Sequence, residues 1–258
     1  MVASSRWAAA GASVLRVWTE IHEASLDRGR RTLDPMPAIV LVTTALVLTM
    51  QRYVGGRAGF ERVAEAWSLD LGAHGELWSF AWWGGWCVIG YLVVPALVVA
   101  CVPGQRLAEY GWSLVGFRRH VWGYALLYLL VLPLVVGVAH TEAFRATYPF
   151  YRQAHRSAFD LVAWELIYAA QFLSLEFFFR GFMLHGLKRS MGVHAIWVMV
   201  VPYCMIHFGK PVAETLGAIV AGVVLGTVAL RTGSIWGGVV VHVGVAVTMD
   251  LLTVSMLR

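Results

Sequence analysis

Long apolar runs separated by short polar or glycine-rich segments dominate the sequence. Each run is close to the roughly 20 residues that an α-helix needs to cross a bilayer. The runs occupy residues 36–53, 79–102, 120–139, 159–187, 193–208, 212–230 and 234–256. The segments between them, such as YVGGRAG, CVPGQR and HFGKP, have a turn-forming composition. The pattern predicts an all-α fold, a polytopic transmembrane helix bundle with about seven spans.

The first 35 residues do not continue this pattern. They carry charge throughout and lack the clean apolar region of a cleavable signal peptide. Two interpretations stay open for this segment: an amphipathic helix that lies on the membrane surface, and a mobile tail. We therefore expect a cytoplasmic or interfacial N-terminal segment, 1–35, followed by a transmembrane domain, 36–258.

Composition and charge favour a membrane protein over a soluble one. The 258-residue chain is 59% apolar and 14% charged, with a mean hydropathy of +0.68, whereas soluble domains are about a quarter charged. The net charge of +5 comes from Lys and Arg residues scattered between the apolar runs, which argues against a nucleic-acid partner. Placing the N-terminus inside puts more of these basic residues on the cytoplasmic side, so we expect that orientation.

Several ionisable residues interrupt the apolar runs. A charged group at the centre of a bilayer costs roughly 2.5–3.5 kcal/mol on insertion scales, so each one needs a physical reason. Glu176 and Arg180, in SLEFFFRGFMLHG, are four residues apart and can pair on one helix face. The others are Glu165, His207, Glu214, His242 and Asp250. We interpret Glu165 and Asp250 as structural, and His185 and His194, which flank a loop, as solvated.

Four of these groups, on four different runs, are predicted to share one depth in the membrane. At a rise of about 1.5 Å per residue, the group comprises Glu176, His207, Glu214 and His242 and lies roughly 12–24 Å from the cytoplasmic ends of the runs. A carboxylate and a histidine can deprotonate a water molecule, and a second histidine can stabilise an oxyanion. Two histidines with carboxylates also match a zinc site with an open position. Both arrangements hydrolyse amides.

Three short motifs resemble those of a known family. LEFFFRG spans Leu175 to Gly181, YCMIH ends at His207, and GSIWGGVVVHVGVA contains His242. In this order and spacing they resemble the CAAX-protease and bacteriocin-processing family (CPBP, ABI) of glutamate-type intramembrane peptidases, over about residues 106–256. The resemblance implies an endopeptidase that cleaves near the C-terminus of a membrane-associated protein or peptide. It also implies a substrate with a membrane-anchored or lipidated tail, and we expect a location in the bacterial inner membrane.

The resemblance also suggests a role for each candidate residue. Glu176, helped by Glu214, would activate water, Arg180 would set the charge state of Glu176, and Tyr203 would support the site. His207 would hold the water and His242 would stabilise the oxyanion. The family leans to a site without a cofactor. If the enzyme used zinc instead, its ligands would be His207, His242 and Glu176.

The sequence departs from the family pattern at two positions. Leu175 stands where the family has its first glutamate, and Ala246 stands where it has an asparagine or aspartate. An inactive family member that binds peptides, or acts as a scaffold or immunity protein, is therefore the first alternative. A small ion-coupled transporter is the second, because intramembrane Glu and His residues also form proton relays. Repeated halves, which transporters often show, are not visible in the sequence.

Overall fold

The computed structural model describes residues 13, 15–24, 26 and 34–256. This part of the chain is almost entirely helical, and its only β-type pairing is an isolated bridge between Trp112 and Ser234. The principal α-helices are α2 (Met36–Met50), α3 (Arg57–Ala66), α4 (Gly75–Val88), α5 (Val94–Cys101), α6 (Leu114–Arg119), α7 (Val121–Ala139), α8 (Glu142–Thr147), α9 (Ala158–Glu176), α10 (Leu184–Met191), α11 (Ala195–Met205), α12 (Val212–Thr232) and α13 (Trp236–Met256). The predicted all-α polytopic bundle is confirmed.

Three π-helical stretches extend or join these helices. The stretch η1 (Gln51–Gly55) extends α2, η3 (Ile89–Val93) joins α4 to α5, and η5 (Phe177–Met183) joins α9 to α10. Short 3₁₀ turns occur at η2 (Gly72–His74), η4 (Leu107–Glu109) and η6 (Gly192–His194). A π-helical turn inserts one residue into an α-helix and is frequent at functional sites. The η5 stretch lies at the centre of the bundle, and all seven of its residues are buried.

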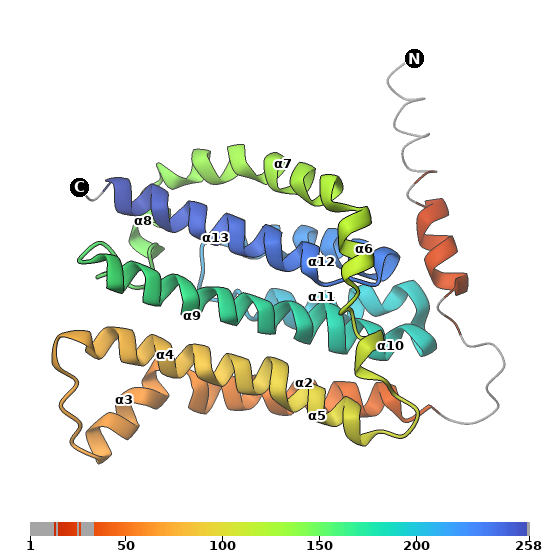
Figure 1. Ribbon diagram of the computed structural model, residues 1–258, viewed down its shortest axis with the longest axis horizontal. Coiled ribbons are helices and arrows are strands. Elements are labelled where there is room, and N and C mark those ends of the chain that lie inside the picture. The colour runs from red at the N-terminus through yellow and green to blue at the C-terminus, as the bar shows by residue number, and fades with distance from the viewer. Residues whose placement is uncertain (1–12, 14, 25, 27–33, 257–258) are drawn as a thin grey trace.

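The long helices lie roughly parallel to one another in layers. Figure 1 shows α7, α13, α9 and α4 following one another across the bundle, with α12 next to α13, and the α2 extension η1 contacts α4. The element η5 contacts helices from both sides of the bundle, including α2 and α5 on one side and α11 and α12 on the other. Helix α9 and its extension η5 therefore form the centre against which the other layers pack.

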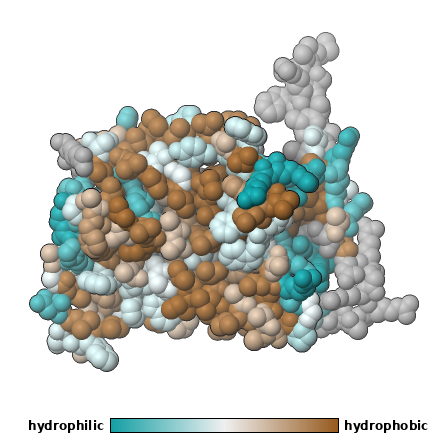
Figure 2. Space-filling view, viewed as in Figure 1, coloured by the Kyte–Doolittle hydropathy of each residue, from teal (hydrophilic) through white to brown (hydrophobic). Residues whose placement is uncertain are grey.

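The outer surface of the bundle is apolar. Leu126, Leu129, Leu130 and Leu134 on α7 are 57–70% exposed, and Figure 2 shows hydrophobic residues over most of the visible face, with hydrophilic ones mainly toward its two ends. Exposed leucines are stable in lipid, where backbone polar groups must be bonded within the helices. Together with six helical runs long and apolar enough to cross a membrane, this surface makes the chain an integral membrane protein.

Among the described residues, six helical runs are long and apolar enough to cross a membrane, where the sequence predicted about seven. The predicted fourth and fifth spans belong to one helical run of 48 residues, 158–205, which turns at Gly192. Its last helix, α11, has 11 residues, which at ~1.5 Å per residue covers about half of the ~30 Å hydrocarbon core. Helix α11 is therefore too short to cross alone, although its apolar sequence resembles that of a span.

Part of the predicted N-terminal segment is described. Residues 15–24 are helical. They contact the end of the bundle where α11 begins. The Trp18 ring packs edge-on against Trp197 at 5.5 Å between centroids, and Glu20 pairs with Arg231 at 3.1 Å. The rest of 1–35, apart from residues 13, 26 and 34–35, lies outside the described residues.

Gly192 should be a stability determinant of this turn. Its φ of 55° and ψ of −133° fall in a region that side chains strongly disfavour, and a Cβ there would collide with the His22 ring. We expect Gly192→Ala to lower the free energy of unfolding by about 1–3 kcal/mol, measured by thermal unfolding in detergent micelles. The matched control is Gly217→Ala in α12, where a Cβ meets nothing within 4 Å. Equal melting temperatures for the two variants would contradict the expectation.

Candidate active site

The first motif places a carboxylate and a guanidinium at the centre of the bundle. Glu176 is the last residue of α9 and Arg180 lies within η5. Nη1 of Arg180 lies 3.1 Å from Oε1 of Glu176, and both residues are fully buried. The predicted pairing of Glu176 with Arg180 on one helix face is therefore seen in the structure. Five buried phenylalanine and methionine residues of η5 provide apolar atoms around the pair.

The third motif meets this pair from α13. Nδ1 of His242 lies 2.6 Å from Oε1 of Glu176. One turn earlier on α13 stands Gly238, where a Cβ would collide with the Glu176 carboxylate. The Phe172 ring lies parallel to the imidazole, with 5.3 Å between centroids and 9° between planes. A glycine thus allows the carboxylate to approach α13, and an aromatic ring fixes the orientation of His242.

The second motif completes the group through Tyr203 on α11. Its hydroxyl lies 3.0 Å from Nε2 of His242, and the guanidinium carbon of Arg180 lies 4.0 Å from the centroid of its ring. Tyr203 therefore touches residues of both other motifs. We call Glu176, Arg180, Tyr203 and His242 the charge cluster. Its members come from segments 66 residues apart at most, and only the folded bundle brings all four together.

His207 lies beside the charge cluster. Its Nδ1 is 2.8 Å from the backbone carbonyl oxygen of Tyr203, one helical turn earlier. Its ring packs edge-on against the Tyr203 ring at 5.0 Å between centroids. Thr215 at the start of α12 donates its hydroxyl to the His207 carbonyl at 3.0 Å. These contacts hold His207 at the turn between α11 and α12, half-buried and with Nε2 free of the backbone bond.

The cluster is energetically costly for a membrane-spanning bundle. The contacts of Glu176 with Arg180 and His242 are short enough for ion pairs but do not have the geometry of hydrogen bonds. Neither the carboxylate oxygens of Glu176 nor the Arg180 side-chain nitrogens have a hydrogen-bond partner among the described residues. Removing such charges from water costs several kcal/mol per ion, which mutual attraction only partly offsets. Intramembrane ionisable residues with these costs usually mark functional sites. The arrangement therefore indicates chemistry, since apolar side chains would pack here at lower cost.

The structure places Glu214 away from the charge cluster. Its Oε1 lies 2.6 Å from Nζ of Lys210, and the Tyr148 hydroxyl lies within 2.9 Å of both carboxylate oxygens. Burial, followed by neighbouring groups that include Glu214, raises the pKa of the Tyr148 hydroxyl, which therefore donates as a neutral phenol. Glu214 joins the 148–156 loop to the turn before α12. The expectation that Glu214 helps Glu176 finds no contact to support it.

The alternative zinc ligand set is not assembled. Within the described ranges, no group of three or more His, Cys, Asp and Glu side chains is placed to hold a metal ion. Both ring nitrogens of His242 face protein groups, namely Glu176 and Tyr203. Nδ1 of His207 faces a backbone carbonyl. Zinc dependence therefore stays a prediction from the sequence, for which the structure shows no assembled ligand set among the described residues.

The two positions that depart from the family pattern are both buried among apolar groups. Leu175 is 4% exposed in the apolar core around η5. Ala246, one turn after His242, is 5% exposed in a second apolar cluster with Trp164 and Tyr168. Neither position supplies a polar atom. Any chemistry at this site must therefore use the charge cluster and His207.

The interpretation of His185 as solvated was wrong. His185 is 5% exposed, and its Nδ1 lies 2.8 Å from the backbone carbonyl oxygen of Arg180. A π-helical turn changes the backbone hydrogen-bond pattern, and the imidazole provides the carbonyl with a donor. His194, in contrast, is exposed as predicted. Proximity to a loop in sequence was a poor guide, because α10 packs back onto α2.

Two features of the site were missed by the sequence reasoning. Phe172, which stacks on His242, lies four residues before Glu176 and so shares its helix face. Gly238 lies four residues before His242 in the same way. These spacings were available as signals. Outside the site, the sequence reasoning also missed Asp160, fully buried near the start of α9, which accepts hydrogen bonds from Tyr151 and Arg156.

The buried acid Asp250 has a partner on α9. Its Oδ2 accepts a hydrogen bond from Nε1 of Trp164 at 2.5 Å. Glu165, the next residue on α9, is half-buried, and its Oε1 has no hydrogen-bond partner among the described residues. Among the described residues, neither acid forms a hydrogen bond or ion pair with a member of the charge cluster. The structural interpretation of both residues stays a prediction.

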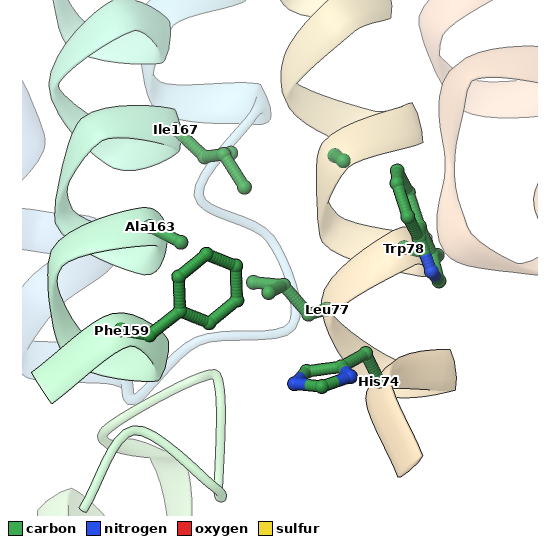
Figure 3. Close-up of a pocket in the computed structure, with 7 residues that line it drawn as sticks. His74, Leu77, Trp78, Phe159, Ala163 and Ile167 are labelled. Atoms are coloured by element: carbon green, nitrogen blue, oxygen red, sulfur yellow. The ribbon is translucent and has the colours of Figure 1, made fainter. Parts of the chain in front are cut away.

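A cavity of about 290 Å³ lies elsewhere in the bundle. Figure 3 shows Phe159, Ala163 and Ile167 of α9 facing Leu77 and Trp78 of α4, with His74 at one end. Its walls are almost wholly apolar, and none of the lining residues belongs to the charge cluster. The charge cluster, and not this cavity, is therefore the candidate active site.

Comparison with known proteins supports the resemblance. Residues 157–248 match the family described as Type II CAAX prenyl endopeptidase Rce1-like, and the resemblance to the CAAX-protease family is confirmed over this segment. All members of the charge cluster and His207 lie inside it. Searches of curated proteins and of solved structures find no match to the chain. The chain is thus a polytopic membrane protein with a CAAX-endopeptidase-like segment.

Loss of Arg180 should destabilise the protein far more than loss of a surface arginine. Arg180→Met leaves the Glu176 carboxylate buried without its cation, so we expect the free energy of unfolding to fall by about 3–5 kcal/mol. The control is Arg189→Met, which removes an exposed pair with Glu109 worth about 0–1 kcal/mol. Thermal unfolding in detergent micelles measures both.

A double variant separates the ion pair from the packing of the arginine. Glu176→Gln combined with Arg180→Met removes both charges, and we expect it to be more stable than Arg180→Met alone, because no uncompensated ion remains. If the double variant is as unstable as the sum of the single variants, the charges do not interact and the expectation is wrong.

Proposed function

We propose that the protein is an intramembrane endopeptidase that hydrolyses a peptide bond near the C-terminus of a membrane-associated protein or peptide. The observation that carries the proposal is the 2.6 Å contact between Glu176 and His242. It joins a carboxylate to an imidazole in a buried site formed by residues of two separate motifs. The match to a prenyl endopeptidase family over 157–248 supports the same class of reaction.

The Glu176–His242 pair provides the acid–base chemistry that amide hydrolysis needs. The pair accepts a proton from water while the water oxygen bonds to the carbonyl carbon and the carbonyl π electrons move to oxygen. The C–N bond then breaks, its electron pair stays on nitrogen, and the stored proton passes to the departing amine. A positioned acid–base group of this kind contributes about 10²–10⁴-fold to the rate. The reaction consumes one water and needs no other reactant.

Arg180 and His207 assist this pair. The guanidinium at 3.1 Å keeps Glu176 ionised in a medium of low dielectric constant, where the attraction between the charges is strong. His207, half-buried next to Tyr203, is positioned to hold the attacking water through its Nε2. His242 carries protons in this scheme and is not mainly an oxyanion donor, because its Nδ1 faces the carboxylate and its Nε2 faces the Tyr203 hydroxyl.

The substrate class follows from the location of the charge cluster. The cluster is buried within helical runs that are long and apolar enough to span a membrane, so a scissile peptide has to enter the bundle from the membrane or its surface. A C-terminal tail with a membrane anchor or a lipid satisfies this condition. The description of the matching family as a prenyl endopeptidase points to the same kind of tail.

A second candidate function is peptide binding without catalysis. Leu175 and Ala246 are buried in apolar clusters and supply no polar group, which favours this alternative. Stability distinguishes the two. In a protein that only binds, His242→Leu should be neutral or stabilising, because no function requires the buried imidazole.

Glu176→Gln should remove most of the cleavage activity, and the activity of the wild type should not depend on a metal ion. We expect a loss of about 10²–10⁴-fold in kcat for internally quenched peptides that carry a membrane anchor near the C-terminus, assayed in detergent micelles. A chelator should leave wild-type activity unchanged. The control is Glu165→Gln, which alters a half-buried carboxylate outside the charge cluster and should cleave like wild type.

Two results would contradict this proposal. Full activity of Glu176→Gln would show that the carboxylate takes no part in hydrolysis. Loss of activity with a chelator, restored by Zn²⁺, would show that the enzyme depends on a metal.

A further inference from the structure

We propose that the Tyr203 hydroxyl is a catalytic acid–base group, which exchanges its proton with His242 in a Glu176–His242–Tyr203 relay. The inference rests on the proposed function, because it assigns a further group to the same reaction. Three contacts carry it: 2.6 Å from Glu176 to Nδ1 of His242, 3.0 Å from Nε2 to the Tyr203 hydroxyl, and the Arg180 guanidinium over the Tyr203 ring.

The two partners of His242 determine which ring nitrogen carries the proton. A carboxylate accepts hydrogen bonds and does not donate them, so the ion-pair contact of 2.6 Å with Oε1 of Glu176 favours the form of His242 that carries its hydrogen on Nδ1. In a neutral imidazole Nε2 is then an acceptor. A tyrosine hydroxyl at 3.0 Å is the matching donor. The Tyr203 proton is therefore directed at the one nitrogen that can take it.

This order of groups is the one that activates a hydroxyl in serine hydrolases. There a carboxylate orients a histidine and stabilises its cation, and the histidine accepts the proton of a hydroxyl. Here Glu176 occupies the carboxylate position, His242 the base position and Tyr203 the hydroxyl position. The parallel Phe172 ring keeps the imidazole plane in the orientation that both contacts require.

Arg180 lies over the face of the Tyr203 ring. Its guanidinium carbon lies 4.0 Å from the ring centroid. A cation over an aromatic face is attracted by the negative charge of that face, and the attraction grows when desolvation removes competing water. A phenolate ring carries more negative charge than a phenol ring, so the guanidinium favours the deprotonated form. One arginine thus supports both Glu176 and Tyr203.

The relay balances over the whole reaction. As the water oxygen bonds to the carbonyl carbon, a water proton passes to the Tyr203 oxygen and the Tyr203 proton passes to Nε2 of His242. Glu176 stabilises the resulting imidazolium. When the C–N bond breaks, Nε2 returns its proton to the Tyr203 oxygen, and Tyr203 gives a proton to the amine nitrogen. Tyr203 and His242 end in their starting states.

The charged and titratable groups around Tyr203 are few. Arg180 faces it from η5, His242 from α13 and His207 from the turn after α11. Glu176 of α9 acts on Tyr203 through its own charge and through His242, and Glu214 of α12 also acts on it electrostatically. Helix α12 faces the ring with Gly222, where a Cβ would press on the ring. A pH profile of cleavage that depends on Tyr203 is therefore set by these groups.

The test compares Tyr203→Phe with a matched loss of hydroxyl elsewhere. Tyr203→Phe keeps the ring beneath Arg180 and removes only the donor. The control is Tyr128→Phe, which removes a hydroxyl contact of 2.7 Å between α7 and Thr248 of α13. The probe is an internally quenched peptide that ends in a farnesylated cysteine followed by three residues, assayed in detergent micelles beside Glu176→Gln.

We expect Tyr203→Phe to lower kcat by about 10²-fold or more, to leave KM within twofold, and to remove the alkaline limb of the pH profile. Tyr128→Phe should match wild type in all three, while both variants melt at similar temperatures. A second measurement needs no substrate. In ¹⁵N-histidine-labelled wild type, His242 should show a protonated Nδ1 and an unprotonated Nε2 signal that shifts in Tyr203→Phe.

The outcomes separate the inference from the proposed function. If Glu176→Gln loses cleavage while Tyr203→Phe keeps wild-type kcat and pH profile, the relay is overturned and the endopeptidase proposal stands. A rise in KM with kcat unchanged would also overturn the relay, because it would show that the Tyr203 hydroxyl contributes to substrate binding and not to the chemical step. A wild-type His242 protonated on Nε2 would do the same. If Glu176→Gln cleaves like wild type, the proposed function itself fails.

Discussion

The buried pairing of Glu176 with Arg180 is the interaction on which the rest of the structure depends. Both side chains are fully buried in apolar helices and lie 3.1 Å apart. Neither can stay ionised in such surroundings alone, because desolvation costs more than a single contact returns. Further groups therefore gather around them. His242 approaches the carboxylate from α13, and Tyr203 covers the guanidinium from α11.

The helix packing accommodates this polar centre with small and aromatic residues. Gly238 and Gly222 remove side chains where the carboxylate and the Tyr203 ring have to approach a neighbouring helix. Small residues allow close helix approach in membranes, where lipid provides no hydrophobic drive for association. Outside this centre the polarity is reversed from that of a soluble protein, because leucines face outward. The bundle thus excludes bulk water from the groups that would carry out hydrolysis.

The charge cluster differs from the family pattern by the loss of two polar side chains and the gain of one hydroxyl. Leu175 and Ala246 remove two polar groups, and Tyr203 stands where the family motif has phenylalanine. Its hydroxyl adds a polar atom at 3.0 Å from His242. The site thus lacks two polar groups of the family pattern and has one additional hydroxyl next to the same histidine. The Glu214 carboxylate pairs with Lys210 and Tyr148 instead of contacting this group.

By itself the sequence determined the all-α membrane fold and the Glu176–Arg180 pair, because apolar run length and the spacing of four residues on one helix are local properties. Tertiary structure decided what the local pattern leaves open. The contact of His242 with Glu176, the bond from Tyr203 to His242 and the burial of His185 depend on how helices rotate against one another. The pairing of Glu214 with Lys210 depends on the same packing, and so does the joining of two predicted spans into one helical run that turns at Gly192. Hydrophobic periodicity places a residue on a helix face, whereas side-chain packing between helices selects its partner.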